Sequence, residues 1–245
     1  MNIQNILNQL GNLKNQRGLN SFEKAIVTTY DKLYGSLTEK QQEILDDPSR
    51  FKIVQGVRQS GKSRFLNTIA LLTTMFIPDK MVFLGSYKKL SARNNLEDIK
   101  ELYYSLPEVG KPEVITWNQN QIEFVNHSTI YTGAVTPYCT RGLGIDLLIL
   151  DEIAFCNNTN VKDFWDSNFP IMKHRGEVII ASTRANRSKK NFFWNTWIGA
   201  GEGFNDFKRF AIASKDCTFS RTSAKEWKKH LGRAGYEKEH IIRWS

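Results

Sequence analysis

Two kinds of hydrophobic pattern alternate along this chain. Short runs of apolar and β-branched residues, which predict strands, fall at 52–55, 81–85, 114–117, 122–125, 129–132, 147–150 and 177–181. Longer segments with apolar residues at helical spacing fall at 3–13, 21–33, 38–45, 65–72, 92–106, 161–168 and 223–243. Strands that alternate with helices favour a mostly parallel, three-layered α/β sheet, and N-Q-N-Q at 118–121 favours one hairpin within it.

The segment between the first strand and the next helix reads G-V-R-Q-S-G-K-S, a complete G-x-x-x-x-G-K-[ST] phosphate-binding loop. Two glycines permit backbone torsions and a close approach that a Cβ would block. The lysine can reach the β- and γ-phosphates, and the final serine is placed to ligate Mg²⁺. The positions expected to bind nucleotide are Gly56, Val57, Arg58, Gln59, Ser60, Gly61, Lys62 and Ser63.

A second signal is the run I-D-L-L-I-L-D-E at 145–152, whose continuous apolar centre is typical of a parallel strand buried on both faces. Asp151 falls at the carboxyl end of that strand, where an acid can hold the Mg²⁺ shell. Glu152 follows directly and could deprotonate the water that attacks the γ-phosphate. The two signals together predict an ATP-hydrolysing P-loop NTPase of the additional-strand, catalytic-glutamate type, with ATP and Mg²⁺ as cofactors.

Each signal has a plainer interpretation when it is taken alone. A Gly-containing turn can produce the loop pattern, and a core strand that meets solvent can end in Asp-Glu. The Asp-Glu pair follows the loop by about 90 positions, with α/β elements between them, and this order favours the nucleotide site. A water-activating base directly after the Asp favours hydrolysis over phosphotransfer to a small substrate.

Three further residues could take part. The side-chain amide of Gln41 can pair with N6 and N7 of adenine, although an ordinary surface Gln is the alternative. Arg58 carries the planar fork suited to phosphate and to transition-state charge, or it is simply an exposed basic residue. Arg141 could reach a neighbouring subunit's site as an arginine finger, or form a local salt bridge.

Composition limits the partners. The 245 residues carry a net charge of +9, which suggests a polyanionic partner without distinguishing nucleic acid from simple solubility. The cysteines Cys139, Cys156 and Cys217 and the four histidines form no zinc pattern or disulfide framework, so a reducing cytosol is expected. No signal peptide is visible, and the most apolar stretch, 66–77, is too short to cross a bilayer.

Five short motifs occur in an order that resembles one known family. They are L-x-x-x-Q at 37–41, V-R-Q-S-G-K-S at 57–63, T-R-G at 140–142, I-D-L-L-I-L-D-E at 145–152 and I-I-A-S-T at 179–183. Together they resemble the ATPase domain of the large terminase subunit, the motor that packages DNA in tailed bacteriophages. The resemblance covers about 37–197 and is most specific in the R-Q-S-G-K-S loop.

The resemblance implies roles for four residues. Arg58 would sense phosphate in cis and Arg141 would act in trans, while Ser182 and Thr183 would form the motif that couples hydrolysis to movement. A homo-oligomeric ring would grip double-stranded DNA by its phosphates in the host cytoplasm, with the portal protein and the small terminase subunit as partners and a procapsid as the destination.

The resemblance also implies a division of the chain. Residues 1–36 would be a helical segment packed on the motor, 37–212 the ATPase core, and 213–245 a helical linker that leads toward a nuclease domain. The stretch after 183 has no Asp/Glu set on strand ends of the kind that a two-metal nuclease needs, so no nuclease activity is expected from this chain alone.

The coupling motif departs from the family pattern, because Arg184 stands where members commonly have Pro. The basic residues that follow make either a DNA-facing loop or a solvated patch; they are Arg184, Arg187, Lys189 and Lys190. Two other functions remain possible: a helicase-like translocase, which should bring a second motor domain, and a protein that binds ATP only as a structural clamp.

Overall fold

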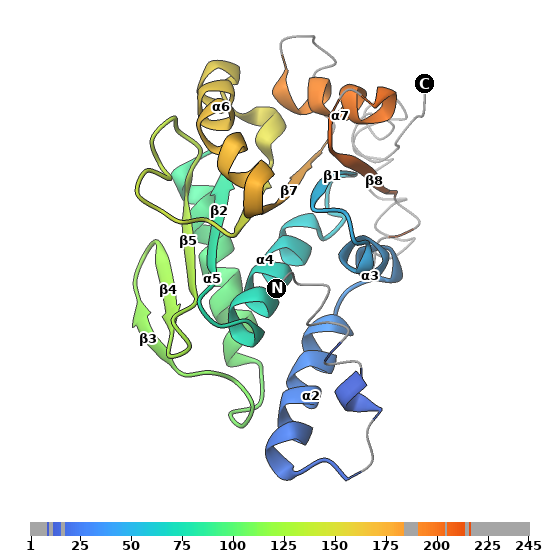
Figure 1. Cartoon of the computed structure of the whole chain (residues 1–245), viewed down its shortest axis with the longest axis vertical. Helices are drawn as coiled ribbons and strands as arrows, with labels where there is room; N and C mark the ends of the chain where they lie inside the picture. Colours follow the sequence, from blue (N-terminus) through green and yellow to red (C-terminus); the bar gives the residue numbers. More distant parts are fainter. Residues whose placement is uncertain are drawn as a thin grey trace, which may run out of the picture.

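The computed structural model describes residues 9, 12–15, 18–183, 191–203, 205–213 and 216, and it is built around one eight-stranded sheet with helices on both faces (Figure 1). The strands are β1 (Phe51–Gly56), β2 (Met81–Ser86), β3 (Val114–Trp117), β4 (Gln121–Phe124), β5 (Thr129–Ala134), β6 (Leu147–Asp151), β7 (Glu177–Ser182) and β8 (Lys208–Ile212). The helices are α2 (Ser21–Tyr34), α3 (Glu39–Asp46), α4 (Lys62–Phe76), α5 (Lys89–Tyr104), the 3-10 helix η1 (Ile153–Phe155), α6 (Asn158–Arg175) and α7 (Phe192–Glu202).

The strand order is β3-β4-β5-β2-β6-β7-β1-β8, and the six strands from β5 to β8 in this order are parallel. Strand β4 pairs antiparallel with β5, and β3 pairs antiparallel with β4. The predicted α/β class, mostly parallel sheet and hairpin are therefore confirmed. Strand β7 lies between β1, which leads into the phosphate loop, and β6, which ends at Asp151. This inserted strand is the one that the additional-strand type requires.

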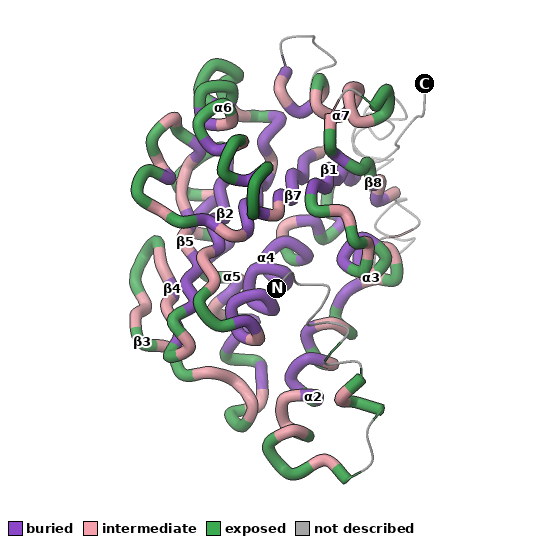
Figure 2. The backbone as a smooth tube through the Cα atoms, in the orientation of Figure 1, coloured by how far each residue is buried: buried purple, intermediate pink, exposed green. Residues whose placement is uncertain are grey.

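Alternate residues of the central strands enter two different cores. Val54 of β1 and Ile149 of β6 pack in the core that α4 and α5 share, whereas Ile53 and Leu148 pack in the core formed with α6 and α7. Burial on both faces explains why these strands read as continuous apolar runs. Figure 2 shows the buried backbone concentrated in α4 and the central strands. The loop that precedes α4 is thus anchored to the most enclosed helix.

The ends of the parallel strands are set by the sheet register. Asp151 of β6 pairs with Ser86 of β2 on one side and with Ala181 of β7 on the other, and Gln55 of β1 pairs with Ser182 of β7. Because the strands are parallel, their carboxyl ends finish at one edge of the sheet. The loop and the Asp-Glu pair that are predicted to bind and hydrolyse nucleotide follow or occupy these ends.

Several predicted boundaries are confirmed, and others are corrected. Thr38 caps α3 as predicted, since its hydroxyl accepts the N–H of Gln41. Helix α6 was predicted at 161–168 but runs over Asn158–Arg175, because Asn157 caps it one turn earlier and the helix continues through Pro170. The elements α7 and β8 were not predicted at all.

Some predictions fall outside the described residues. These include the segment 223–243, Cys217, the basic residues between 184 and 190, and most of the segment 3–13. The division at 36 and 212 stays a prediction. In the part of the chain that is described, no helix is both long and apolar enough to cross a membrane.

Candidate nucleotide site

The phosphate-binding loop turns directly from β1 into α4. Gly61 precedes the helix with φ +74°, in the left-handed region that favours glycine, and Gln59 also has a positive φ of 60°. A Cβ on Gly56 would lie 2.6 Å from Ser60 Oγ and 2.6 Å from Lys62 Cδ, so only glycine fits there. The N-terminus of α4 therefore closes a loop of backbone N–H groups, an arrangement that binds phosphate.

Lys62 lies inside this loop, with 5% of its surface exposed. Its ammonium donates to the carbonyl of Val57 at 3.1 Å and lies 3.7 Å from Oε1 of Glu152. A buried ammonium is costly unless it is paired. Those two acceptors hold the charge at the carboxyl edge, beside the carboxylate predicted to activate water.

Asp151, which is 3% exposed, joins three elements at the end of β6. Its Oδ2 accepts a hydrogen bond from the Ser63 hydroxyl at 2.8 Å and another from Asn95 Nδ2 of α5 at 3.2 Å. Burial, and next the neighbouring Glu152 carboxylate, raise the pKa of Asp151, while the hydrogen bonds from Ser63 and Asn95 and the charge of Lys62 act in the opposite direction.

The second oxygen of this carboxylate fits a metal ion. Asp151 Oδ1 is buried and has no hydrogen-bond partner within the described part of the chain. A buried oxygen left in this way is costly in a protein interior unless a bound ion or water satisfies it. Mg²⁺ is a suitable ion, because it usually takes one or two carboxylates together with water and substrate phosphates. Ser63 and Asp151 are the side chains that could hold it.

Glu152 has φ 52° and ψ 36°, a left-handed conformation that is uncommon for a residue with a side chain. Its Oε2 accepts hydrogen bonds from Ser182 Oγ at 3.0 Å, from the Thr183 N–H at 3.0 Å and from Thr183 Oγ1 at 3.1 Å. The predicted coupling residues therefore contact the predicted catalytic carboxylate directly. Strain at such a position costs about 1–3 kcal/mol and persists where the surroundings fix it.

Gln41 contacts the loop instead of projecting away from it. Its Oε1 accepts the N–H of Thr38 at 3.0 Å, and its Nε2 lies 3.3 Å from the carbonyl of Ser60 and 3.4 Å from that of Gly61. The side chain is 4% exposed, so both ends of its amide are engaged within the chain. It braces the loop in this structure, and its pairing with adenine stays a prediction that would require these bonds to be exchanged.

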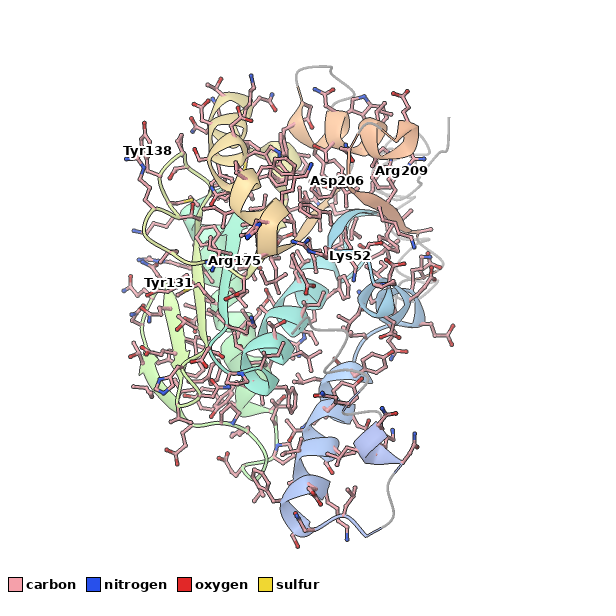
Figure 3. The ribbon with its side chains drawn as sticks, viewed as in Figure 1. Lys52, Tyr131, Tyr138, Arg175, Asp206 and Arg209 are labelled. Atoms are coloured by element: carbon pink, nitrogen blue, oxygen red, sulfur yellow. The ribbon has the colours of Figure 1, made fainter. Side chains whose placement is uncertain are left out.

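The two arginines lie on the surface. Arg58 is exposed within the loop, and Arg141 is exposed on the segment between β5 and β6. The guanidinium carbon of Arg141 lies 4.1 Å from the ring centroid of Tyr138, itself 64% exposed at the periphery of the molecule (Figure 3). The contact that holds Arg141 is thus a cation–π contact. Its trans role stays a prediction.

Sequence reasoning missed Asn95. The signal was present, because the helical spacing of Ala92, Leu96 and Ile99 defines a buried stripe on which a polar residue stands out. A polar side chain on such a stripe requires a partner, and here the partner is Asp151.

Comparison with known proteins identifies the family. A family model described as terminase large subunit, T4likevirus-type, N-terminal, matches residues 53–236. This chain belongs to that family. The match runs from the phosphate-loop strand past β8 and includes four of the five motifs, all but the one at 37–41, so the predicted membership of the large terminase family is confirmed.

Solved terminase structures share the fold. The Thermus phage P74-26 large terminase ATPase domain is 20% identical with a TM-score of 0.62, over 86% of this chain and 95% of that one. A large terminase from a thermophilic bacteriophage, in complex with ATP-gamma-S, is 12% identical with a TM-score of 0.67, over 85% of this chain and 53% of that one. The HK97 bacteriophage large terminase is 15% identical with a TM-score of 0.59, over 94% and 45%. This chain therefore spans about half the length of the last two proteins.

Proposed function

We propose that this terminase chain hydrolyses ATP and uses the turnover to move double-stranded DNA into a procapsid. The observation that carries the proposal is the convergence of the loop lysine, the loop serine and two adjacent carboxylates at one edge of the sheet. Lys62 lies 3.7 Å from Glu152, and Ser63 lies 2.8 Å from Asp151. The ATP-gamma-S complex of the thermophilic bacteriophage large terminase supports nucleotide binding by this fold.

The chain's own residues have separate tasks in this proposal. The loop N–H groups and Lys62 bind the phosphates of ATP, and Ser63 and Asp151 hold Mg²⁺. When bound, Mg²⁺ neutralises charge on the β- and γ-phosphates. Glu152 accepts the proton of the attacking water, and Arg58 and Arg141 stabilise the charge of the transferring phosphoryl group.

In this proposal, Ser182 and Thr183 link ATP hydrolysis to movement. They donate to the same oxygen of Glu152, so any displacement of β7's end changes the orientation of the catalytic carboxylate. In the reverse direction, a change at Glu152 during turnover is transmitted to Ser182 and Thr183. This direct contact supports the coupling role that the family resemblance implies.

The grip on DNA is proposed to be through phosphates. A net charge of +9 supports a polyanionic partner, and contacts to phosphates are independent of sequence and weaken as salt is raised. The assembly is a homo-oligomeric ring in the host cytoplasm that meets the portal protein and the small terminase subunit. Membership of the large terminase family supports this setting.

The decisive experiment measures steady-state phosphate release with and without duplex DNA, in the wild-type chain and in Glu152→Gln. We expect the variant to keep nucleotide binding and lose turnover, because the amide cannot accept the proton. Exposed Glu97→Gln is the matched control and should behave as wild type. Normal hydrolysis by Glu152→Gln would contradict the assigned role, and a wild-type chain that binds ATP without releasing phosphate would indicate a structural clamp.

A further inference from the structure

Asn95 is a buried polar side chain at the carboxyl edge of the sheet to which none of the five motifs assigns a role. It lies on α5, away from the loop and from β6 in sequence, and only 5% of its surface is exposed. Its neighbours on the helical stripe, Ala92 and Leu96, are apolar and buried. Burial of an amide is unfavourable without hydrogen bonds, so its contact with Asp151 determines what Asn95 does.

We propose that Asn95 is a positioning residue, which holds the Asp151 carboxylate in the orientation that a Mg²⁺–nucleotide complex requires. The inference rests on the proposed function of the same site. Asn95 Nδ2 lies 3.2 Å from Asp151 Oδ2, and the Ser63 hydroxyl lies 2.8 Å from that same oxygen. Two donors from two different helices fix one oxygen, and the other oxygen, Oδ1, is left buried without a partner in the described chain.

The two donors are not equivalent. Ser63 belongs to the phosphate loop and is itself expected to ligate the metal ion, so its contacts change when nucleotide binds. Asn95 belongs to α5 and donates to the acid from the side of that helix. It therefore keeps the carboxylate in place whether or not nucleotide is bound. Partners of this kind, which contact a ligand rather than the metal, affect metal affinity by about 10–100-fold.

The test measures binding of a fluorescent ADP analogue to the full chain during a Mg²⁺ titration, and again in EDTA. Asn95→Ala removes the donor, and Asn95→Leu removes it while keeping a side chain that branches at Cγ. The matched control is Asn94→Ala, because Asn94 is the neighbouring amide on the same helix and is exposed. Thermal unfolding of the nucleotide-free proteins shows that each variant is folded.

In both Asn95 variants we expect the Mg²⁺ concentration for half-maximal binding to rise about tenfold, with nucleotide affinity in EDTA unchanged. Asn94→Ala should match wild type in both measurements. A role limited to packing would lower the two affinities together, and that result, or an unchanged Mg²⁺ dependence in both Asn95 variants, would overturn the inference. The proposed function fails differently, through a wild-type chain that releases no phosphate.

Discussion

Lys62, Asp151 and Ser182 lie at the carboxyl edge of the sheet with 5%, 3% and 0% of their surfaces exposed, whereas Arg58 and Arg141 are exposed on loops. The buried group is held by donors and acceptors of the same chain, apart from the unpartnered oxygen of Asp151. The two arginines lie outside this enclosure. The difference suggests that phosphate binding and proton transfer need only the buried residues of one chain, while the proposed trans action of Arg141 depends on a neighbouring subunit that approaches its surface.

The largest effect is expected on the buried side, from Lys62→Met. Methionine keeps the aliphatic stem that lies against Gly56, but it removes the ammonium that is proposed to bind the phosphates. Loss of one preorganised charged donor typically lowers turnover by about 10²–10³-fold, and nucleotide affinity should fall as well. Phosphate release and nucleotide titration check this. Lys89→Met, at an exposed position, serves as the control, and a similar loss there would show that the effect is not specific to the loop.

Substitutions of the proposed coupling residues, Ser182 and Thr183, should have smaller effects than Lys62→Met, and the two substitutions should differ in their effect on stability. Thr183→Val removes one donor to Glu152 and keeps the shape, so turnover should fall about tenfold with nucleotide affinity unchanged, as expected for a hydrogen bond to a charged group. Ser182→Ala also leaves the N–H of Ala154 without its acceptor, so it should lower stability by about 1–3 kcal/mol as well.

Stopped-flow phosphate release and thermal unfolding separate these two effects. The control is Ser167→Ala on α6, where the exposed hydroxyl bonds to the carbonyl of Asp163. If Thr183→Val hydrolyses ATP at the wild-type rate, the contact with Glu152 is not part of the reaction, and the proposed coupling route is wrong.

The loop and the Asp-Glu strand could be predicted from sequence because their chemistry depends on local spacing. Gly56 and Lys62 are six positions apart in one turn, and Asp151 ends a strand whose apolar run is continuous. The hydrogen bond from Asn95 could not be predicted, because it depends on how α5 packs against β6. The contacts of the Gln41 side chain could not be predicted from its motif either, because the same amide can bond to a helix cap, to the loop or to adenine.

The two missed elements have a similar explanation. Helix α7, F-F-W-N-T-W-I-G-A-G-E, has apolar or small residues on nearly every face and two glycines near its end, so it shows little helical contrast. Strand β8 begins with Lys208 and Arg209, and only its pairing with β1 makes it a strand. In both cases tertiary contacts determine the secondary structure, and these contacts cannot be read from a single sequence.

Gln41→Ala should have a moderate effect. It tests whether the Gln41 side chain supports the phosphate loop or recognises adenine. Loss of the cap bond and of the contacts with the loop should lower stability by about 1 kcal/mol and weaken ATP and GTP binding by the same factor. Gln42→Ala is the control, because Gln42 bonds to carbonyls of the preceding turn and not to the loop. A selective loss of ATP binding would show instead that Gln41 reads adenine.

Arg141→Ala should have the smallest effect on the isolated chain. An exposed residue held by a ring contact contributes little, so the free energy of unfolding should change by at most about 0.5 kcal/mol. Turnover should fall only under conditions where copies assemble.

A mixing experiment distinguishes cis from trans action of Arg141. Arg141→Ala chains keep Glu152, and Glu152→Gln chains keep Arg141. If the arginine acts on a neighbouring subunit, a mixture of the two inactive proteins should regain phosphate release, since some sites receive both groups. A mixture as inactive as its components would show that Arg141 acts on the site of its own chain. The site would then need no residue from a neighbouring subunit.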